Sequence, residues 1–259
     1  MGKIIALTNQ KGGVGKTSTT LGLAGALRKL GRSVLTVDCD PQCNTSKSFG
    51  IRDTHGLATI GDIYDENAGV GECIYETERG DILPNDKELR DKEAAYAVVP
   101  INVYILKKAL DEVKEYYDYI IIDTPPNAGF YMTSAIIASD GVIIPLEAEI
   151  FSIDGLGAML EYIERAKYFN PSCQIYGALL NGVDRRFSQH IEIQNQLHSE
   201  GEKVGLHVFD SEIRTCQDIS NAQGKNEDLF DNKKYRYSNA VADYMAVAEE
   251  LEGMIHERE

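Results

Sequence analysis

The sequence predicts an α/β fold: a doubly wound, mostly parallel sheet with helices on both faces. Three observations support this prediction. Short apolar runs alternate along the chain with segments whose apolar residues recur at helical spacing. The runs are nearly continuous, as is typical of strands that helices cover on both faces. The chain has 259 residues, of which 43% are hydrophobic, so we expect one large domain over residues 1–259.

Each predicted strand is a short aliphatic or β-branched run, and the clearest is residues 119–123, where three isoleucines precede a carboxylate. In chain order, the strands are expected at residues 4–7, 34–37, a weaker segment ending at residue 83, 119–123, 141–145 and 174–180. Helical patterns lie between them at residues 16–30, 101–117, 153–169 and 188–200. In such a sheet, ligands bind at the carboxyl ends of the strands.

Two further segments are assigned by composition and spacing. Residues 52–100 are acidic and less regular, so we expect a peripheral insert there and not a separate domain. Residues 235–257 are expected to form a C-terminal packing helix, because apolar residues recur there at helical spacing. The opposite face is acidic, whereas helices that lie on membranes favour basic faces. The apolar residues of this helix are Tyr237, Val241, Tyr244, Met245, Ala248, Leu251 and Ile255.

A glycine-rich loop, Lys-Gly-Gly-Val-Gly-Lys-Thr-Ser, follows the first predicted strand and opens the first predicted helix. Successive backbone N–H groups and a helix N-terminus in this order form a cradle for phosphate. Glycines let the backbone approach phosphate oxygens closely. We predict that Lys16 reaches the β- and γ-phosphates and that the Thr17 hydroxyl holds Mg²⁺. The predicted nucleotide-binding residues of the loop are Lys11, Gly12, Gly13, Val14, Gly15, Lys16, Thr17 and Ser18.

Three carboxylates follow predicted strands. Asp123 ends the most hydrophobic strand, so it can hold Mg²⁺ directly or through water; the alternative is a simple strand-end cap. Asp38 and Asp40 follow the second strand within the sequence Asp-Cys-Asp-Pro-Gln. Taken alone, this pair is equally consistent with a turn at Pro41.

Two other positions each have two interpretations. Lys11 stands before the glycines, where a generic P-loop needs no lysine. It is either a solvated loop charge or a second lysine directed at phosphate, including the phosphate of a partner subunit. Asn181 follows the strand at 174–180, and its amide offers the donor and acceptor that read an adenine edge. Asn181-Gly182 is also a strong turn pair.

These motifs resemble those of the ParA/MinD family of deviant Walker A ATPases, and most closely those of the small, Soj-like ParA type. The family's KGG-x-GK-[ST] motif matches Lys11 as its signature lysine and Lys16 as its P-loop lysine. Residues 123–129 resemble the family's DTPP-x-x-G switch, and residues 38–42 resemble its D-x-DPQ motif. The resemblance extends over most of the chain, including residues 141–155 and 177–186.

The resemblance implies an ATPase that binds ATP and Mg²⁺ and forms a homodimer with ATP. Lys11 would act on the nucleotide of the partner, as an arginine finger in trans does. Asp40 would orient the attacking water, Asp38 would support Mg²⁺ indirectly, and Gly129 would let the switch sense the γ-phosphate. The resemblance favours Asn181 as a nucleotide contact. The predicted catalytic residues are thus Lys11, Lys16 and Asp40, and the predicted metal residues are Thr17, Asp38 and Asp123.

The resemblance also implies partners and a place in the cell. We expect the ATP-bound dimer to bind non-specific DNA and a ParB-type partner to stimulate hydrolysis, in plasmid or chromosome segregation. The protein is expected to be cytoplasmic, to associate with the nucleoid when ATP is bound and to have no membrane partner. The first strand begins near residue 4, so we expect no signal peptide.

The segment that supports DNA binding in the family departs from its usual pattern. The proline of an IPR motif is missing before Arg214, and Asp218 stands where a basic residue is usual. With a net charge of −15, this leads us to expect weaker or more salt-sensitive DNA binding than the family norm. Cys43 replaces the family's usual glycine after Asp-Pro-Gln. The candidate DNA contacts, for which a solvated face is an equal alternative, are Arg185, Arg186, Arg214, Lys233, Lys234 and Arg236.

Other functions remain as alternatives. A MinD-like membrane-cycling ATPase needs a basic amphipathic tail, whereas residues 254–259 read Met-Ile-His-Glu-Arg-Glu. A redox ATPase similar to the nitrogenase iron protein needs cysteines near the switch, and no cysteine lies between Cys73 and Cys173. A bacterial tyrosine kinase needs a C-terminal tyrosine cluster that is absent here. A nucleotide-dependent scaffold without hydrolysis is the alternative from another class. The five cysteines show no metal-site spacing, and we expect reduced thiols.

Overall fold

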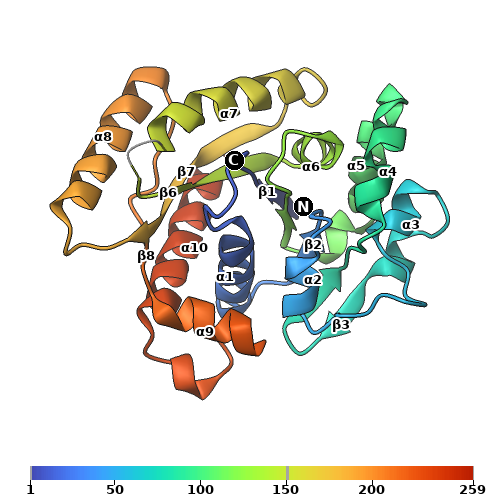
Figure 1. The fold of residues 1–259 in the computed structure, drawn as a ribbon, viewed down its shortest axis with the longest axis horizontal. Coiled ribbons are helices and arrows are strands. Elements are labelled where there is room, and N and C mark those ends of the chain that lie inside the picture. Colours follow the sequence, from blue (N-terminus) through green and yellow to red (C-terminus); the bar gives the residue numbers. More distant parts are fainter. Residues whose placement is uncertain (1, 150–151, 259) are drawn as a thin grey trace.

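An eight-stranded sheet runs through the computed structural model, which describes residues 2–149 and 152–258 (Figure 1). The strand order is β3-β4-β2-β5-β1-β6-β7-β8, and every described pair is parallel except β3 with β4. The strands are β1 Lys3–Leu7, β2 Val34–Asp38, β3 Tyr75–Thr77, β4 Gly80–Leu83, β5 Tyr119–Asp123, β6 Gly141–Glu147, β7 Gln174–Val183 and β8 Ile213–Arg214.

Helices cover both faces of this sheet, which confirms the predicted doubly wound α/β fold. Helices α5, α6 and α7 pack on one face, and α1 and α10 lie side by side on the other (Figure 1). The α-helices are α1 Lys16–Lys29, α2 Asn44–Ser48, α3 Ile60–Tyr64, α4 Leu89–Ala97, α5 Ile105–Val113, α6 Phe130–Ala138, α7 Ser152–Lys167, α8 Ser188–Val204, α9 Gln217–Lys225 and α10 Asn239–Arg258. Short 3₁₀-helices span Val70–Cys73, Pro100–Tyr104, Lys114–Tyr116 and Lys233–Tyr235.

The central strands are apolar along their whole length because they supply both cores. Side chains alternate between the two faces of a strand. In β1, Ile4 points into the core under α5 and α6, whereas Ile5 points into the core under α1 and α10. Ile120 and Ile121 of β5 divide in the same way. A strand buried on both faces therefore needs a continuous apolar run.

The register of the central strands brings the predicted site residues to one edge of the sheet. Leu7 of β1 and Asp38 of β2 both lie in register with Asp123 of β5. The chain leaves β1 at Leu7 and enters the glycine-rich loop, and it leaves β2 toward Asp40. The loop and the three carboxylates thus meet at the carboxyl ends of adjacent parallel strands, where ligands bind in sheets of this kind.

Residues 52–100 are more regular than their sequence indicates. They contain α3, α4 and the hairpin of β3 and β4, and β4 extends the sheet by pairing in parallel with β2. Leu83 and Leu89 are fully buried in the same core as the central strands. These elements are short and depend on tertiary contacts, so their local sequence carries little periodicity.

The C-terminal helix begins later than its sequence indicates. Helix α10 starts at Asn239, and Tyr235 lies in the preceding 3₁₀-helix. Tyr244 packs so closely on α1 that a Cβ atom at Gly22 would collide with its ring. Tyr237, which we expected on the packing face, is instead 89% exposed. It precedes the first turn of the helix, so it does not share the helical register.

Two general features complete the description. Within residues 2–149 and 152–258, no helix is both long and apolar enough to cross a membrane. All five cysteines are free thiols, and Cys216 is the one that is partly exposed.

Candidate functional site

The glycine-rich loop ends at the N-terminus of α1, where the first backbone N–H groups have no acceptor within the helix. Gly15, at the N-cap position, has φ 89° and ψ 21°, and Gly13 has φ 83°. Both lie in the left-handed region, which glycine adopts without strain. No side chain of the described residues caps α1. The first N–H groups of a 14-residue helix are therefore left for an anionic ligand.

Lys16 places a buried cation at the centre of this loop. Its side chain is almost fully covered, and Nζ donates a hydrogen bond to the carbonyl oxygen of Lys11 at 3.1 Å. Burial lowers the pKa of Lys16, and the negative charges of Asp123 and Asp40 oppose that shift. A desolvated lysine with a single backbone acceptor is well suited to bind phosphate oxygens.

Asp123 is fully buried and receives two hydroxyl groups on one oxygen. Thr17 and Thr45 each donate a hydrogen bond to Oδ2 at 2.7 Å. The other oxygen, Oδ1, is buried without a hydrogen-bond partner in the described part of the chain. Burial raises the pKa of the carboxyl group. Thr45, in the first turn of α2, was not identified from sequence because no spacing relates it to β5.

These residues fit a magnesium ion that is completed by phosphate. The described residues contain no group of three His, Cys, Asp or Glu side chains that could hold a metal on their own. Mg²⁺ in phosphate-transfer sites takes one or two protein oxygens together with phosphate oxygens and water. The Thr17 hydroxyl and the Oδ1 of Asp123, which has no partner among the described residues, are oxygens of this kind beside the glycine-rich loop.

Asp38 acts on the backbone that leads into α2. Its Oδ2 accepts hydrogen bonds from the backbone N–H and the hydroxyl of Ser46, at 2.8 and 2.6 Å. Its Oδ1 accepts the N–H of Asp40 at 3.1 Å. Burial, followed by the charge of Asp123, raises the pKa of Asp38. Both oxygens are thus engaged within the chain, which is consistent with an indirect role at a metal and not with direct coordination.

Asp40 lies at the tip of the turn between β2 and α2. Its Oδ1 accepts the N–H of Gln42 at 2.9 Å. Burial raises the pKa of Asp40, and the charges of Lys16 and Arg90 act in the opposite direction. The turn ends at Cys43, a buried residue with φ 55°, in the left-handed region. This backbone conformation explains why glycine suits the position.

Lys11 extends away from the loop toward the end of β6. Its Nζ lies 2.6 Å from Oε2 of Glu149 and 3.3 Å from Oε2 of Glu147. The hydrogen bond from Lys11 to Glu149 is the main reason that the pKa of the lysine is raised. The side chain is 44% exposed, so this contact is a surface ion pair. Breaking such a pair costs little free energy.

Asn181 of β7 contacts the glycine-rich loop and helix α1 through its side-chain amide. Its Nδ2 donates to the carbonyl oxygen of Val14 at 2.8 Å and to the Thr19 hydroxyl at 3.1 Å. Both amide hydrogens are therefore used within the chain, whereas the buried Oδ1 has no hydrogen-bond partner among the described residues. The adenine contact stays a prediction. A Cβ atom at Gly15 would lie 2.7 Å from Nδ2, so the amide also fixes glycine at that position.

The candidate DNA contacts divide into cations with and without a carboxylate partner among the described residues. Arg185 pairs with Glu212, Arg186 with Asp184, Arg214 with Asp243 and Lys234 with Glu227. Lys233 and Arg236 are exposed and form no ion pair with a carboxylate of the described residues. They flank the buried Tyr235 just before α10.

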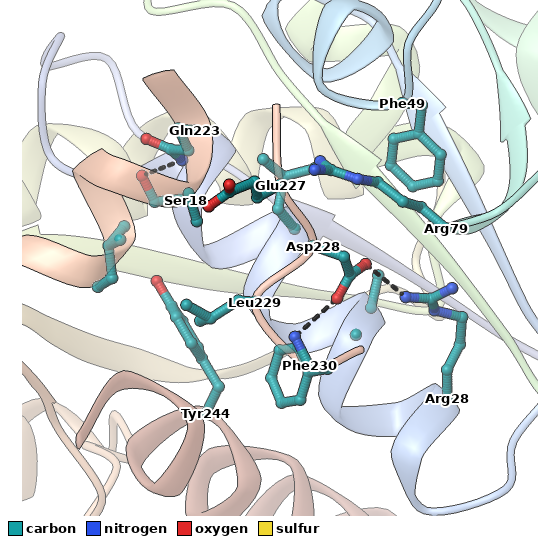
Figure 2. A pocket seen from close by; sticks show the side chains of 16 residues that line it. Ser18, Arg28, Phe49, Arg79, Gln223, Glu227, Asp228, Leu229, Phe230 and Tyr244 are labelled. Carbon is teal, nitrogen blue, oxygen red and sulfur yellow. Dashed lines mark hydrogen bonds and ion pairs between the residues drawn. The ribbon is translucent and has the colours of Figure 1, made fainter. Parts of the chain in front are cut away.

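A small void lies beside α1, and its lining connects that helix to α9 (Figure 2). Gln223 of α9 donates to the hydroxyl of Ser18 at 2.9 Å, and Arg28 binds Asp228 at 3.0 Å. The void measures about 40 Å³, which is too small for a nucleotide. A cleft of about 710 Å³ opens on the adjacent side, against Thr17 and Ser18.

Comparison with known proteins yields a family match and several relatives. A family model described as an AAA domain matches residues 2–175. The chain is 35% identical over 255 residues to the sporulation initiation inhibitor protein Soj of Bacillus subtilis, covering 97% of this chain and 98% of Soj. It is 34% identical over 221 residues to the chromosome partitioning protein ParA of Caulobacter vibrioides, covering 83% of each.

Solved structures show the same architecture. The structure of cobyrinic acid a,c-diamide synthase from Mycobacterium smegmatis, with a bound ATP analog and magnesium, is similar with a TM-score of 0.85 and 26% identity. The match covers 100% of this chain and 98% of that chain. The cell division ATPase MinD of Pyrococcus furiosus gives a TM-score of 0.77 at 24% identity, covering 98% of this chain and 100% of that chain. At that identity the likeness shows the fold alone.

Proposed function

The chain belongs to the Soj/ParA family of chromosome-partitioning ATPases, and from this premise we propose how its residues bind and hydrolyse ATP. The proposal rests on one observation above all. The N-terminus of α1, Lys16 and the pair Thr17–Asp123 converge at the carboxyl edge of the sheet. This arrangement combines amide groups, a cation and a metal-binding oxygen pair around one place for phosphate.

Lys16 and the loop amides bind the phosphates, and Thr17 and Asp123 hold Mg²⁺. When bound, Mg²⁺ neutralises charge that develops on the phosphate oxygens. Asp40 accepts a hydrogen bond from the attacking water and orients it. Its carboxylate is held by Gln42 and lies within reach of the charge of Lys16. Hydrolysis of this kind depends mainly on positioning and charge stabilisation.

Lys11 acts on the nucleotide of a second subunit. Its contacts with Glu147 and Glu149 hold the amine outside its own phosphate cradle in the single chain. Two subunits would meet across their nucleotides, and each Lys11 would exchange these carboxylates for the phosphates of its partner. Hydrolysis removes the γ-phosphate, weakens that attraction and releases the dimer.

The ATP-bound dimer binds non-specific DNA, and a ParB-type partner stimulates hydrolysis. Lys233 and Arg236 are the candidate phosphate contacts that the structure leaves exposed without a described carboxylate partner. Dimerisation doubles the number of such contacts on one particle, which raises affinity for a polyanion without any new contact type.

Light scattering with ADP and with a non-hydrolysable ATP analogue, each with and without DNA, tests this proposal. We expect a dimer only with the ATP analogue, and DNA binding only by that dimer. The Lys11→Ala variant should bind the analogue but remain a monomer, whereas Lys203→Ala, at an exposed lysine on α8, should dimerise normally. A Lys11→Ala protein that dimerises as strongly as the wild type contradicts the role in trans.

A further inference from the structure

The loop that follows Asp123 is held at its far end by side chains from other elements. We name residues 124–129 the switch loop. Helix α6 begins directly after it at Phe130, and Gly129 occupies the N-cap position. Because glycine has no side chain, the loop cannot cap the helix itself. The first N–H groups of α6 must therefore find acceptors elsewhere.

Glu93 of α4 supplies one of these acceptors. Its Oε1 accepts the backbone N–H of Phe130 at 2.9 Å and lies 3.5 Å from Nδ2 of Asn127, inside the switch loop. A Cβ atom at Gly129 would collide with the same oxygen. The carboxylate thus touches the loop at its last residue and caps the following helix. A negative charge at a helix N-terminus is favourable, and its hydrogen bond is charge-assisted.

Two further contacts fix the same end of the loop. The Tyr131 hydroxyl donates to the carbonyl oxygen of Leu89 at 2.6 Å, so α4 is tied to the first turn of α6 at two points. From the other side, the Tyr162 hydroxyl of α7 donates to the carbonyl oxygen of Gly129 at 3.1 Å. The end of the switch loop is therefore held between α4 and α7.

Helix α4 also places a charge near Asp40, on the turn between β2 and α2. Arg90 lies one turn before Glu93, and its positive charge opposes the rise that burial causes in the pKa of Asp40. The same short helix thus contacts the end of the switch loop through Glu93 and places the charge of Arg90 near the residue that we assign to the attacking water. Glu93 itself is half-buried, and no described contact joins it to the glycine-rich loop.

We propose that Glu93 is a positioning residue for hydrolysis: it sets the conformation of the switch loop through Phe130 and so couples α4 to the γ-phosphate site. This proposal rests on the proposed function, in which that loop responds to the nucleotide. Glu93 touches no part of the phosphate cradle, so its loss should slow turnover and leave ATP binding unchanged.

Steady-state hydrolysis by Glu93→Ala and Glu93→Gln tests the proposal. Glutamine keeps an oxygen acceptor for the Phe130 amide, whereas alanine leaves that amide without a partner. For alanine we expect kcat to fall about tenfold or more, with the affinity for a fluorescent ATP analogue within about twofold of wild type. Glutamine should recover most of kcat. Asp91→Ala removes an exposed acid from the same helix and should behave as wild type.

A second readout is hydrogen exchange at the amides of residues 127–131. It is measured on Glu93→Gln, so it remains available if the alanine variant does not fold. A neutral amide oxygen holds the Phe130 N–H less strongly than a carboxylate does. The glutamine variant should therefore exchange somewhat faster there than wild type, with its melting temperature little changed. Unchanged kcat in the alanine variant, or parallel losses of kcat, ATP affinity and thermal stability in both variants, overturns the proposal. If instead the wild type neither dimerises with ATP nor hydrolyses it, the proposed function fails before Glu93 is tested.

Discussion

In the proposed function, nucleotide binding depends most directly on Lys16. Its side chain is buried near the charges of Asp123 and Asp40, and within the described part of the chain its amine donates one hydrogen bond, to the backbone of Lys11. Lys16→Met should weaken ATP binding by about 10- to 100-fold, the loss expected for one hydrogen bond to a charged group. Titration with a fluorescent ATP analogue measures this.

The matched control for this variant is Lys29→Met, at the exposed last residue of the same helix. It should bind ATP as the wild type does. Equal affinities for the wild type and Lys16→Met would show that the loop amides alone hold the phosphates.

Substitutions at Cys43 show how much its left-handed backbone conformation, in the turn between β2 and α2, affects stability. Its φ of 55° lies in a region that disfavours side chains, and β-branched ones most of all. Cys43→Val should therefore lower the free energy of unfolding by about 1–2 kcal/mol relative to Cys43→Gly. Urea unfolding of the two variants measures the difference. A valine variant at least as stable as the glycine variant would show that the turn relaxes to another conformation.

At the scale of elements, β7 supports the glycine-rich loop through Asn181. The buried amide donates to Val14 and to Thr19, so Asn181→Ala leaves both acceptors without this partner. We expect the free energy of unfolding to fall by about 1–3 kcal/mol. ATP affinity should also fall, because the loop is less well ordered.

The ratio of ATP to GTP affinity separates this role from adenine recognition. If Asn181 braces the loop, Asn181→Ala should weaken both nucleotides equally and keep the ratio. A variant with unchanged stability that no longer distinguishes ATP from GTP would instead support the adenine contact that the family resemblance favours.

Helix α6 was not predicted from the sequence, because it is buried on nearly every side. Eight of its nine residues are buried, from Phe130 to Ala138. A helix that is apolar on nearly every side has no amphipathic stripe, so its sequence lacks the periodicity by which the outer helices were identified. Helices α1, α7 and α8 have a polar side and were predicted close to their observed bounds.

At the scale of the whole molecule, the net charge of −15 opposes the proposed binding to DNA. Four of the six basic candidates are paired with carboxylates of the chain, and the exposed Lys233 and Arg236 have no carboxylate partner among the described residues. Replacing both by alanine should reduce the slope of log affinity against log salt by about 0.9 for each lost phosphate contact. Fluorescence anisotropy with the ATP analogue, over a salt series, measures the slope.

The pair Arg185→Ala and Arg186→Ala removes the same charge from residues that already have carboxylate partners, and serves as the matched control. This variant should change the slope less. The reverse order would mean that these ion pairs open when DNA binds and that the segment before α10 does not contact it.

The sequence by itself determined the central strands, the glycine-rich loop that follows β1 and the carboxylates at the carboxyl ends of β2 and β5. These are local patterns, since each depends on the order of residues within one short segment. Tertiary structure alone decided that Thr45 shares Asp123 with Thr17, that Asn181 faces Val14, and that Glu93 caps α6. Each of these contacts joins residues that are distant in the chain, and the packing of the sheet and helices brings them together where no local spacing records it.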